Sequence, residues 1–357
     1  VMTTPAGPRS LLFLDKVFLK RVPDPLRGVE LFNLNLVRDL VRLGHPVTLI
    51  AESSWAPAVA TFMGDHAPEG LWFRGVGPDA LATPLAGWRL RGRRFDRLLV
   101  GNVGNGLLPL LHHLHRRRAF DRAVLVAHRE AGPRFVRAWS AWPGCTVAVN
   151  EKIAAPFRAA GGAVQVDYGI FNSERYAPPA ARPAPPVRFI VLGALDNAWK
   201  GADTAQAAWA LLAPALRARA ELHLASFRTP PAVMEGVTAH PWLPADAIPG
   251  LLQGMHVMIC PSRDEVVMRE TFSQAMVQGM LSGLPVLVND LPILTEKLDR
   301  GGGLVFRTVA ELAEQMARLV EEPGLRERLG AEARCTALER YVWDTARFAA
   351  RYLEPSS

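Results

Sequence analysis

The residues best suited to chemistry follow an apolar run at 257–260, where a buried strand would end. Pro261 and Ser262 come next, and an acidic loop leads to Glu270, which precedes a helical pattern over residues 274–281. Ligands of open α/β sheets bind beyond the carboxyl ends of the strands. An acid at such a loop, just before a helix N-terminus, is placed to contact a polar ligand. A helix-capping acid stabilised by the helix dipole is the alternative for Glu270.

A second predicted strand end carries a cation. The apolar run at 188–192 ends in Gly193, Ala194 and Leu195, and Lys200 follows with Gly201 behind it. A flexible ammonium group at a strand end suits a diphosphate, whose charge it neutralises. A plain surface lysine is the alternative.

The N-terminal half offers a helix start and a histidine. Gly28 precedes a helical pattern in which apolar residues recur at spacings of three and four, at Val29, Phe32, Leu36, Leu40 and Leu43. A glycine there lets a ligand approach the first amides and the positive end of the helix dipole. His128 follows the predicted strand at 123–127, and a satisfied strand-end histidine is its alternative interpretation.

These residues must be held by elements that alternate along the whole chain. The first set of predicted strands covers residues 11–14, 47–51, 97–100 and 123–127, and the second covers 188–192, 221–225, 256–260 and 285–288. Strands that alternate with helices form parallel sheets covered on both faces. Two sets in 357 residues predict two doubly wound domains.

The domain boundaries follow from composition. Residues 177–186 read APPAARPAPP, which predicts a semi-rigid connector. We therefore expect an N-terminal Rossmann-like domain at 1–176, a Pro-rich linker at 177–186 and a C-terminal Rossmann-like domain at 187–340. An apolar face within WDTARFAARYL predicts a C-terminal helix at 341–357 that returns to the N-terminal domain.

Composition favours a folded protein without a membrane span. Hydrophobic residues make up 49% of the chain and charged residues 21%, which supports packed cores. No apolar run approaches the roughly 20 residues of a spanning helix. We expect a cytoplasmic protein. The three cysteines, Cys145, Cys260 and Cys335, are far apart, so a disulfide framework is not expected.

Three motifs have bland interpretations. His112, His113 and His115 lack partners at metal spacing and predict a helix surface. The segment GNVGNG contains Gly101, Gly104 and Gly106, whose spacing does not match the dinucleotide-binding fingerprint. This mismatch counts against a nicotinamide oxidoreductase. We interpret the segment as a loop that faces an acceptor. Asp264 and Glu265 are interpreted as solvated loop charges. The chain has no Asp-x-Asp motif, so neither a metal nor a cofactor is expected.

The basic excess lies wholly in the N-terminal half. Residues 1–176 hold 23 Lys plus Arg and 14 Asp plus Glu, whereas the remainder holds 18 and 20. Two arginine clusters stand out, at Arg89, Arg91, Arg93, Arg94 and Arg97, and at Arg116, Arg117 and Arg118. Such patches suit an anionic membrane surface or an anionic acceptor, and a solvated arginine face is the alternative. No nucleic-acid motif accompanies them, so nucleic acid is not an expected partner.

The motifs, taken in order, resemble the family 4 glycosyltransferases of group 1 type. The resemblance covers almost the whole chain and is strongest at 188–306. It is carried by Pro-Ser at 261–262, Glu270 and the Gly-x-Pro-Val at 283–286, by Gly-x-Leu with Lys-Gly at 193–201, and by Gly169, Ile170, Tyr176, Trp343 and Tyr352. It implies a GT-B fold, with two Rossmann-like domains facing across a cleft, and a retaining, metal-independent reaction.

The resemblance also implies roles for single residues. Glu270 would contact donor-sugar hydroxyls, Lys200 would neutralise the diphosphate, and His128 would face the donor sugar and β-phosphate. Gly28 would let the helix N-terminus meet the phosphate, with Arg27 as a candidate helper and Gly193 in the donor loop. The backbone of four residues would line the sugar and phosphates, namely Thr271, Phe272, Ser273 and Gln274.

Two departures concern donor binding. Gln278 stands where the family has a second Glu that accepts hydrogen bonds from the ribose, and Ala194 stands where many members have an Arg. An amide keeps one acceptor oxygen but loses the charge, at a cost of about 1 kcal/mol or somewhat more. Phe171 and Tyr168 also depart from the family, at the hinge.

The expected function is sugar transfer from a nucleoside diphosphate sugar to a hydroxyl acceptor, in polysaccharide, glycolipid or glycoconjugate biosynthesis. The acceptor is open, with a lipid-linked one favoured by the basic clusters, together with peripheral contact of the N-terminal domain with the inner face of the membrane. Three alternatives stay open: a weakly active or non-catalytic sugar-nucleotide binder, an epimerase and a phosphorylase on the same fold.

Overall fold

The chain divides into two compact units in the computed structural model, which describes residues 9–23, 26, 28–74, 82–226, 233–241, 243–263 and 270–354. The first unit comprises Val1–Phe171 with Asp344–Ser357, and the second comprises Asn172–Trp343. The Pro-rich segment at 177–186 thus lies within the second unit, where Arg182 Nη1 donates to the carbonyl oxygen of Met255 at 3.2 Å.

The first unit is built on a parallel sheet. Its seven described strands have the order β3-β2-β1-β4-β5-β6-β7. In chain order the elements are β1 (Leu11–Leu14), α1 (Gly28–Arg42), β2 (Val47–Glu52), α2 (Trp55–Met63), β3 (Glu69–Phe73), α3 (Ala82–Arg89), β4 (Phe95–Val100), α4 (Leu108–Arg116), β5 (Phe120–Ala127), α5 (Pro133–Ser140), β6 (Gly144–Ala148), α6 (Glu151–Ala159) and β7 (Ala163–Val166).

The order of these strands changes direction beside β1. Leu11 of β1 pairs with Val47 of β2 on one side and with Arg97 of β4 on the other. The boundary between β1 and β4 is therefore a topological switch point, and open α/β sheets bind their ligands beyond the carboxyl ends of the strands at such a point. Asp15 and Lys16 follow β1 at this edge, and the glycine-rich loop 101–106 follows β4.

Helix α1 forms where the apolar stripe predicted it. Phe32, Leu36 and Leu40 are buried, each at 2% exposure or less. Leu43 lies past the end of the helix and is 47% exposed, so its inclusion in the buried stripe is wrong. The acid Glu30 in the first turn is also buried, at 6% exposure.

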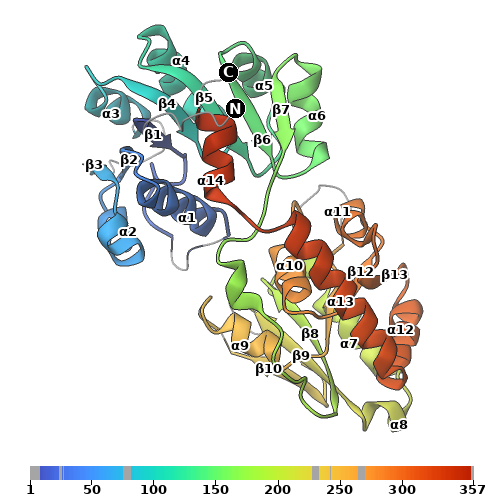
Figure 1. Cartoon of the computed structure of the whole chain (residues 1–357). Helices are drawn as coiled ribbons and strands as arrows, with labels where there is room; N and C mark the ends of the chain where they lie inside the picture. Colours follow the sequence, from blue (N-terminus) through green and yellow to red (C-terminus); the bar gives the residue numbers. More distant parts are fainter. Residues whose placement is uncertain are drawn as a thin grey trace, which may run out of the picture. The chain divides into compact units, whose positions relative to one another are not determined.

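The end of the chain belongs to the first unit. Helix α14 (Thr345–Phe348) continues as a π-helix at Ala349–Leu353 and packs against α1 (Figure 1). Tyr352 Oη lies 3.3 Å from Oδ2 of Asp167, and Thr345 Oγ1 lies 3.4 Å from Oδ2 of Asp39. The apolar face of this segment is buried through Phe348 and Leu353.

The second unit repeats the plan with six described strands in the order β10-β9-β8-β11-β12-β13. In chain order the elements are β8 (Val187–Gly193), α7 (Ala202–Leu211), α8 (Pro214–Arg217), β9 (Ala220–Ser226), β10 (Val237–His240), α9 (Ile248–Gln253), β11 (Val257–Cys260), α10 (Gln274–Leu281), β12 (Val286–Asn289), α11 (Pro292–Thr295), β13 (Gly303–Phe306), α12 (Val309–Glu321) and α13 (Pro323–Arg340).

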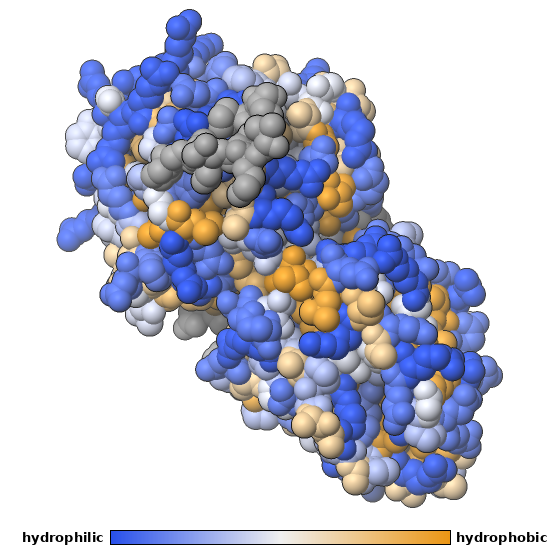
Figure 2. Space-filling model, in the orientation of Figure 1, coloured by the Kyte–Doolittle hydropathy of each residue, from blue (hydrophilic) through white to orange (hydrophobic). Residues whose placement is uncertain are grey.

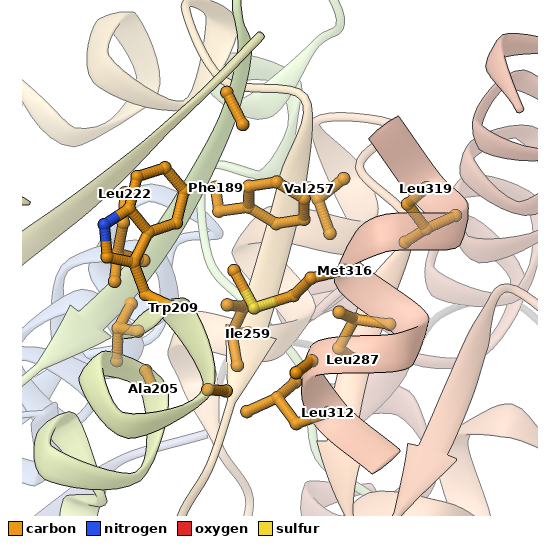
Figure 3. Packing of buried hydrophobic residues seen from close by; sticks show 14 of the residues in the cluster. Phe189, Ala205, Trp209, Leu222, Val257, Ile259, Leu287, Leu312, Met316 and Leu319 are labelled. Carbon is orange, nitrogen blue, oxygen red and sulfur yellow. The ribbon is translucent and has the colours of Figure 1, made fainter. Parts of the chain in front are cut away.

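Alternate residues of these strands face opposite layers of helices. Phe189, Val257 and Ile259 lie against Trp209 of α7 and Met316 of α12 in one apolar cluster (Figure 3). On the other face, a side chain at Gly279 of α10 would meet Met258 at 2.6 Å, so this glycine permits close packing. The direction of strand order changes between β8 and β11, which gives this sheet its own switch point.

Five described strands lie outside the predicted sets, namely β3, β6, β7, β10 and β13. Four of them, β3, β7, β10 and β13, form the edges of the two sheets. Their residues are only partly buried, as in β7, where three of four side chains are exposed.

Surface character agrees with two folded units. On the face in Figure 2, hydrophilic residues cover most of each unit and hydrophobic residues form small groups. None of the described helices combines the length and the apolar character that crossing a bilayer requires.

Candidate functional site

Lys200 and Glu270 form an ion pair at the switch point of the second sheet. Lys200 Nζ lies 2.5 Å from Glu270 Oε2, and 17% and 8% of the two side chains are exposed. Lys200 follows β8 and Glu270 follows β11, and these strands are neighbours. Their carboxyl ends lie at the same edge because the strands are parallel, so the topology brings together two residues far apart in sequence.

Glu270 is held at both carboxylate oxygens. Ser262 Oγ donates to Oε2 at 3.2 Å, and the amide of Ser273 donates to Oε1 at 3.1 Å. Ser262 is itself fixed, since Asn289 Nδ2 donates to its carbonyl oxygen at 3.0 Å. These contacts position Glu270 before the N-terminus of α10, where its carboxylate can accept a hydrogen bond from a ligand hydroxyl.

Lys200 is positioned by the tight turn around it. It ends a 3-10 turn, Ala198–Lys200, and its ammonium lies 4.5 Å from the ring centroid of Trp199. Gly201 follows with φ of 73°, and a Cβ there would lie 2.1 Å from the carbonyl oxygen of Pro261. Close approach of Gly201 to Pro261 therefore joins the β8 loop to the β11 loop. The Lys200 side chain passes Gly193, the last residue of β8.

The loop between Glu270 and α10 has a strained residue at its end. Ser273 has φ of 59°, a left-handed conformation that is uncommon outside glycine, and Gln274 begins α10. Phe272 is 5% exposed, with its ring 5.8 Å from that of Tyr341. The turn thus buries an aromatic side chain and brings the backbone of Thr271–Gln274 to the helix N-terminus, a favourable position for an anion.

Lys297 supports this loop and was missed by the sequence analysis. Its side chain is fully buried, Nζ donates to the carbonyl oxygen of Ile293 at 2.6 Å, and it lies 5.1 Å from the Phe272 ring centroid. Burial lowers the pKa of Lys297, and the charges of Glu296 and Glu270 oppose that effect. No sequence signal marks this residue, because a lysine in a helical segment is normally exposed.

Gln278 lies on α10, eight positions after Glu270 in the sequence. Its Nε2 donates to Tyr176 Oη at 2.9 Å. Tyr176 belongs to the same unit and is 8% exposed. The amide is therefore fixed by a hydroxyl that can both donate and accept.

In the first unit, His128 lies in an aromatic box. It follows β5, and its ring lies 4.8 Å from that of Phe32 and 5.4 Å from that of Tyr168. Its Nε2 is buried without a hydrogen-bond partner. Burial lowers the pKa of His128 to about 3. The imidazole is therefore neutral at physiological pH and holds an unused polar atom, which suits a ligand hydroxyl or phosphate oxygen.

A buried acid follows β1 in the same unit, another residue that the sequence analysis missed. Asp15 Oδ2 accepts from Asn33 Nδ2 at 2.5 Å, and Oδ1 accepts from the amide of Val17 at 2.9 Å. Burial raises the pKa of Asp15 to about 6; the Val17 amide lowers it, and the charge of Glu30 raises it. Its position directly after the predicted strand at 11–14 was the available signal.

The other predicted residues are placed as follows. Gly28 is the exposed first residue of α1. Arg27, Asp264 and Glu265 lie outside the described residues. His112 and His113 are exposed on α4 and His115 is partly buried there, and no three metal-binding side chains gather in the described part of the chain. The cysteines are unpaired. Arg97 of the first arginine cluster is buried on β4, at 4% exposure, and does not belong to a surface patch.

Comparison with known families concerns the second unit. Residues 186–322 match the family model described as Glycosyl transferases group 1. The matched residues lie almost wholly within the second unit and cover most of it. No curated protein matches the sequence.

Solved structures extend the similarity to the whole chain. HepE from Anabaena, in complex with UDP-glucose, has a TM-score of 0.70 and 16% identity, covering 96% of this chain and 98% of that one. The sucrose-phosphate synthase of Thermosynechococcus elongatus has a TM-score of 0.72 and 15% identity, covering 95% and 96%. A glycosyltransferase from Rickettsia africae has a TM-score of 0.72 and 12% identity, covering 98% and 100%.

These matches confirm the predicted GT-B architecture of two Rossmann-like domains. The match to the group 1 model supports a glycosyltransferase. The roles assigned to single residues stay predictions.

Proposed function

We propose that the protein is a retaining glycosyltransferase that moves a sugar from a nucleoside diphosphate sugar to a hydroxyl acceptor, without a metal ion. The observation that carries the proposal is the Lys200–Glu270 pair, at 2.5 Å, beside the N-terminus of α10. The structure of HepE contains UDP-glucose, which makes a UDP-sugar the first donor to test.

The pair offers a positive charge for the diphosphate of the sugar donor and a carboxylate for the sugar hydroxyls. In this proposal the donor diphosphate pairs with the ammonium of Lys200 and accepts hydrogen bonds from the amides of Thr271–Gln274. Glu270 accepts hydrogen bonds from sugar hydroxyls. Gln278 faces the ribose. An ammonium group and helix amides stabilise the negative charge that grows on a leaving diphosphate, which is the main requirement of the reaction.

The bond changes balance without a protein nucleophile. The bond between the anomeric carbon and the diphosphate oxygen breaks, and the acceptor oxygen bonds to the same face of that carbon. The acceptor proton passes to the departing diphosphate. The products are the glycosylated acceptor with retained configuration and a nucleoside diphosphate. Neutral His128, with its unpartnered Nε2, is proposed to accept a hydrogen bond from the donor sugar or to donate one to the β-phosphate, according to its tautomer.

Two measurements test the proposal. The first is a thermal-shift panel of UDP, GDP, ADP, dTDP and their common sugars, in which one base should raise the melting temperature by several degrees. The second is release of the nucleoside diphosphate in the presence of candidate acceptors, compared between the wild type and Lys200→Ala.

A matched control separates local from general effects. Lys152→Ala removes an exposed lysine that pairs with Glu130 in the first unit, and its turnover should equal that of the wild type. Full activity of Lys200→Ala would refute the assignment. Nucleotide binding without acceptor-dependent release would identify a binder instead, and interconversion of the sugar itself would identify an epimerase.

A further inference from the structure

A large cavity lies in the first unit, between α3 and α4. Its volume is about 980 Å³, at the upper end of the range typical of ligand sites. Pro84 and Trp88 of α3 and Pro109 and Leu110 of α4 form apolar walls. A Cβ at Gly87 would lie 3.5 Å from Leu110, so the two helices approach closely there.

The mouth of the cavity exposes an aromatic side chain. Trp88 is 64% exposed, whereas Leu110 is 2% exposed. A large indole left in solvent beside an apolar wall gains free energy when a hydrocarbon group covers it. The apolar part of the ligand is therefore expected to extend from Leu110 toward Trp88.

Cations surround this apolar surface. Lys16, Arg91 and Arg117 line the cavity together with the imidazole of His113, and no acid is among its described lining residues. Lys16 follows β1, and its side chain passes the glycine-rich loop that follows β4, where a Cβ at Gly106 would lie 3.9 Å from Nζ. The cavity thus reaches the switch point of the first sheet, the usual ligand position in this type of sheet.

The structure divides the arginine cluster at 89–97 into two groups. Arg93 pairs with Glu69 at 2.8 Å, and Arg94 pairs with Asp121 at 2.7 Å. Neither lines the cavity, whereas Arg91 does. Cationic charge in the cavity therefore comes from particular side chains and is not a uniform property of the surface.

We propose that this cavity binds a lipid phosphate, with the hydrocarbon chain against Trp88 and Leu110 and the phosphate held by Lys16, Arg91 and Arg117. The idea that this lipid carries the sugar acceptor rests on the proposed glycosyltransferase function. The idea that the cavity binds a lipid phosphate does not depend on that function. Inorganic phosphate would leave the apolar wall without a contact, and a neutral lipid would leave the three cations without a counter-charge.

Calorimetric titration of the full chain tests the site with decyl phosphate, decanol and inorganic phosphate. Decyl phosphate should bind at least tenfold more tightly than either of the others. Arg91→Ala/Arg117→Ala should weaken decyl phosphate tenfold or more, since two charge-assisted contacts are lost. Arg93→Ala/Arg94→Ala also removes two positive charges, but from the neighbouring ion pairs. It should change the affinity for decyl phosphate less than twofold. Trp88→Ala should weaken decyl phosphate but not inorganic phosphate.

Three results would overturn the proposal. Inorganic phosphate that binds as tightly as decyl phosphate would mean an anion site without a lipid. Equal losses in the two double variants would mean diffuse surface charge. Loss of binding to phosphatidylglycerol-containing vesicles in Arg91→Ala/Arg117→Ala, with unchanged decyl phosphate affinity, would mean a membrane surface. Nucleotide thermal shifts measured on every variant report separately on the donor site, so failure of one proposal is distinguishable from failure of the other.

Discussion

The ammonium nitrogen of Lys200 lies 2.5 Å from Oε2 of Glu270, although the two residues are 70 positions apart. Both are largely buried, and Ser262 and Ser273 bind the same carboxylate. Each charge therefore has a partner inside the protein, and removing one residue of the pair would leave the other as an unpaired, largely buried charge.

Removing Lys200 alone should destabilise the second unit. Lys200→Met leaves a buried carboxylate without its cation, and we expect a loss of about 3 kcal/mol in the free energy of unfolding, at the low end of the range for buried pairs because Lys200 is 17% exposed. Lys200→Met/Glu270→Gln should recover most of that loss, because no charge remains unpaired. Urea denaturation of the two single variants and the double variant measures the coupling. Strictly additive losses would show that the two side chains do not interact.

Gln278→Glu should tighten nucleotide binding. The Tyr176 hydroxyl can rotate to donate to the new carboxylate, which then accepts from the ribose with a charge-assisted bond. A gain of about 1 kcal/mol corresponds to roughly fivefold in Kd, measured by calorimetry with the preferred nucleotide. Gln278→Asp carries the same charge on a shorter side chain and should give no gain. Weaker binding by Gln278→Glu would mean that Gln278 serves a different contact.

Gly201→Ala should disrupt the donor site, and Gly161→Ala should not. Both glycines have positive φ, of 73° and 79°, but only Gly201 has a neighbour, since its Cβ would meet the Pro261 carbonyl at 2.1 Å. The backbone conformation costs about 1–2 kcal/mol in either variant. Gly201→Ala should lose several kcal/mol in total and its nucleotide thermal shift. Equal stability losses would show that the contact with Pro261 relaxes easily.

His128 should make the protein less stable in acid. Burial lowers its pKa to about 3 in the folded state, so between its ordinary pKa of about 6.5 and pH 3 only the unfolded chain takes up the proton. The contribution of His128 to the free energy of unfolding therefore falls as pH falls over this range, by about 1.4 kcal/mol per pH unit. His128→Phe retains a ring in the aromatic box and should be more stable than the wild type at pH 5, relative to their difference at pH 7.5. A pH-independent difference between the two proteins would contradict a neutral, buried His128.

Asp15 should act in the opposite direction. Its pKa is raised by burial to about 6 in the folded state, so the folded protein holds the proton between about pH 4 and pH 6 and the unfolded chain does not. This contribution to stability is present at pH 4 and lost as pH rises to 6, about 3 kcal/mol at most. Asp15→Asn should remove that slope and be more stable than the wild type at pH 7. The measurement is the free energy of unfolding of the two proteins from pH 4 to pH 7, and parallel curves would refute it.

The sequence by itself determined the class of fold and the motifs of the second unit. Buried central strands are continuous apolar runs, as at Leu11–Leu14 and Val257–Cys260, and such runs can be recognised without a structure. The edge strands β3, β7, β10 and β13 were not found, because a strand with a solvated side has no such run. Glu270 and Lys200 were identified from their positions after strands, which parallel topology makes informative.

Only the tertiary structure decided which distant side chains meet. Pairing of β8 with β11 places Lys200 against Glu270, and burial turns Lys297 from an ordinary helical lysine into a support for Phe272. The structure likewise separates Arg91, which lines a cavity, from Arg93, which pairs with Glu69. Residue type and spacing fix local preference, whereas burial and charge pairing depend on strand order and helix packing, which bring together residues far apart in the chain.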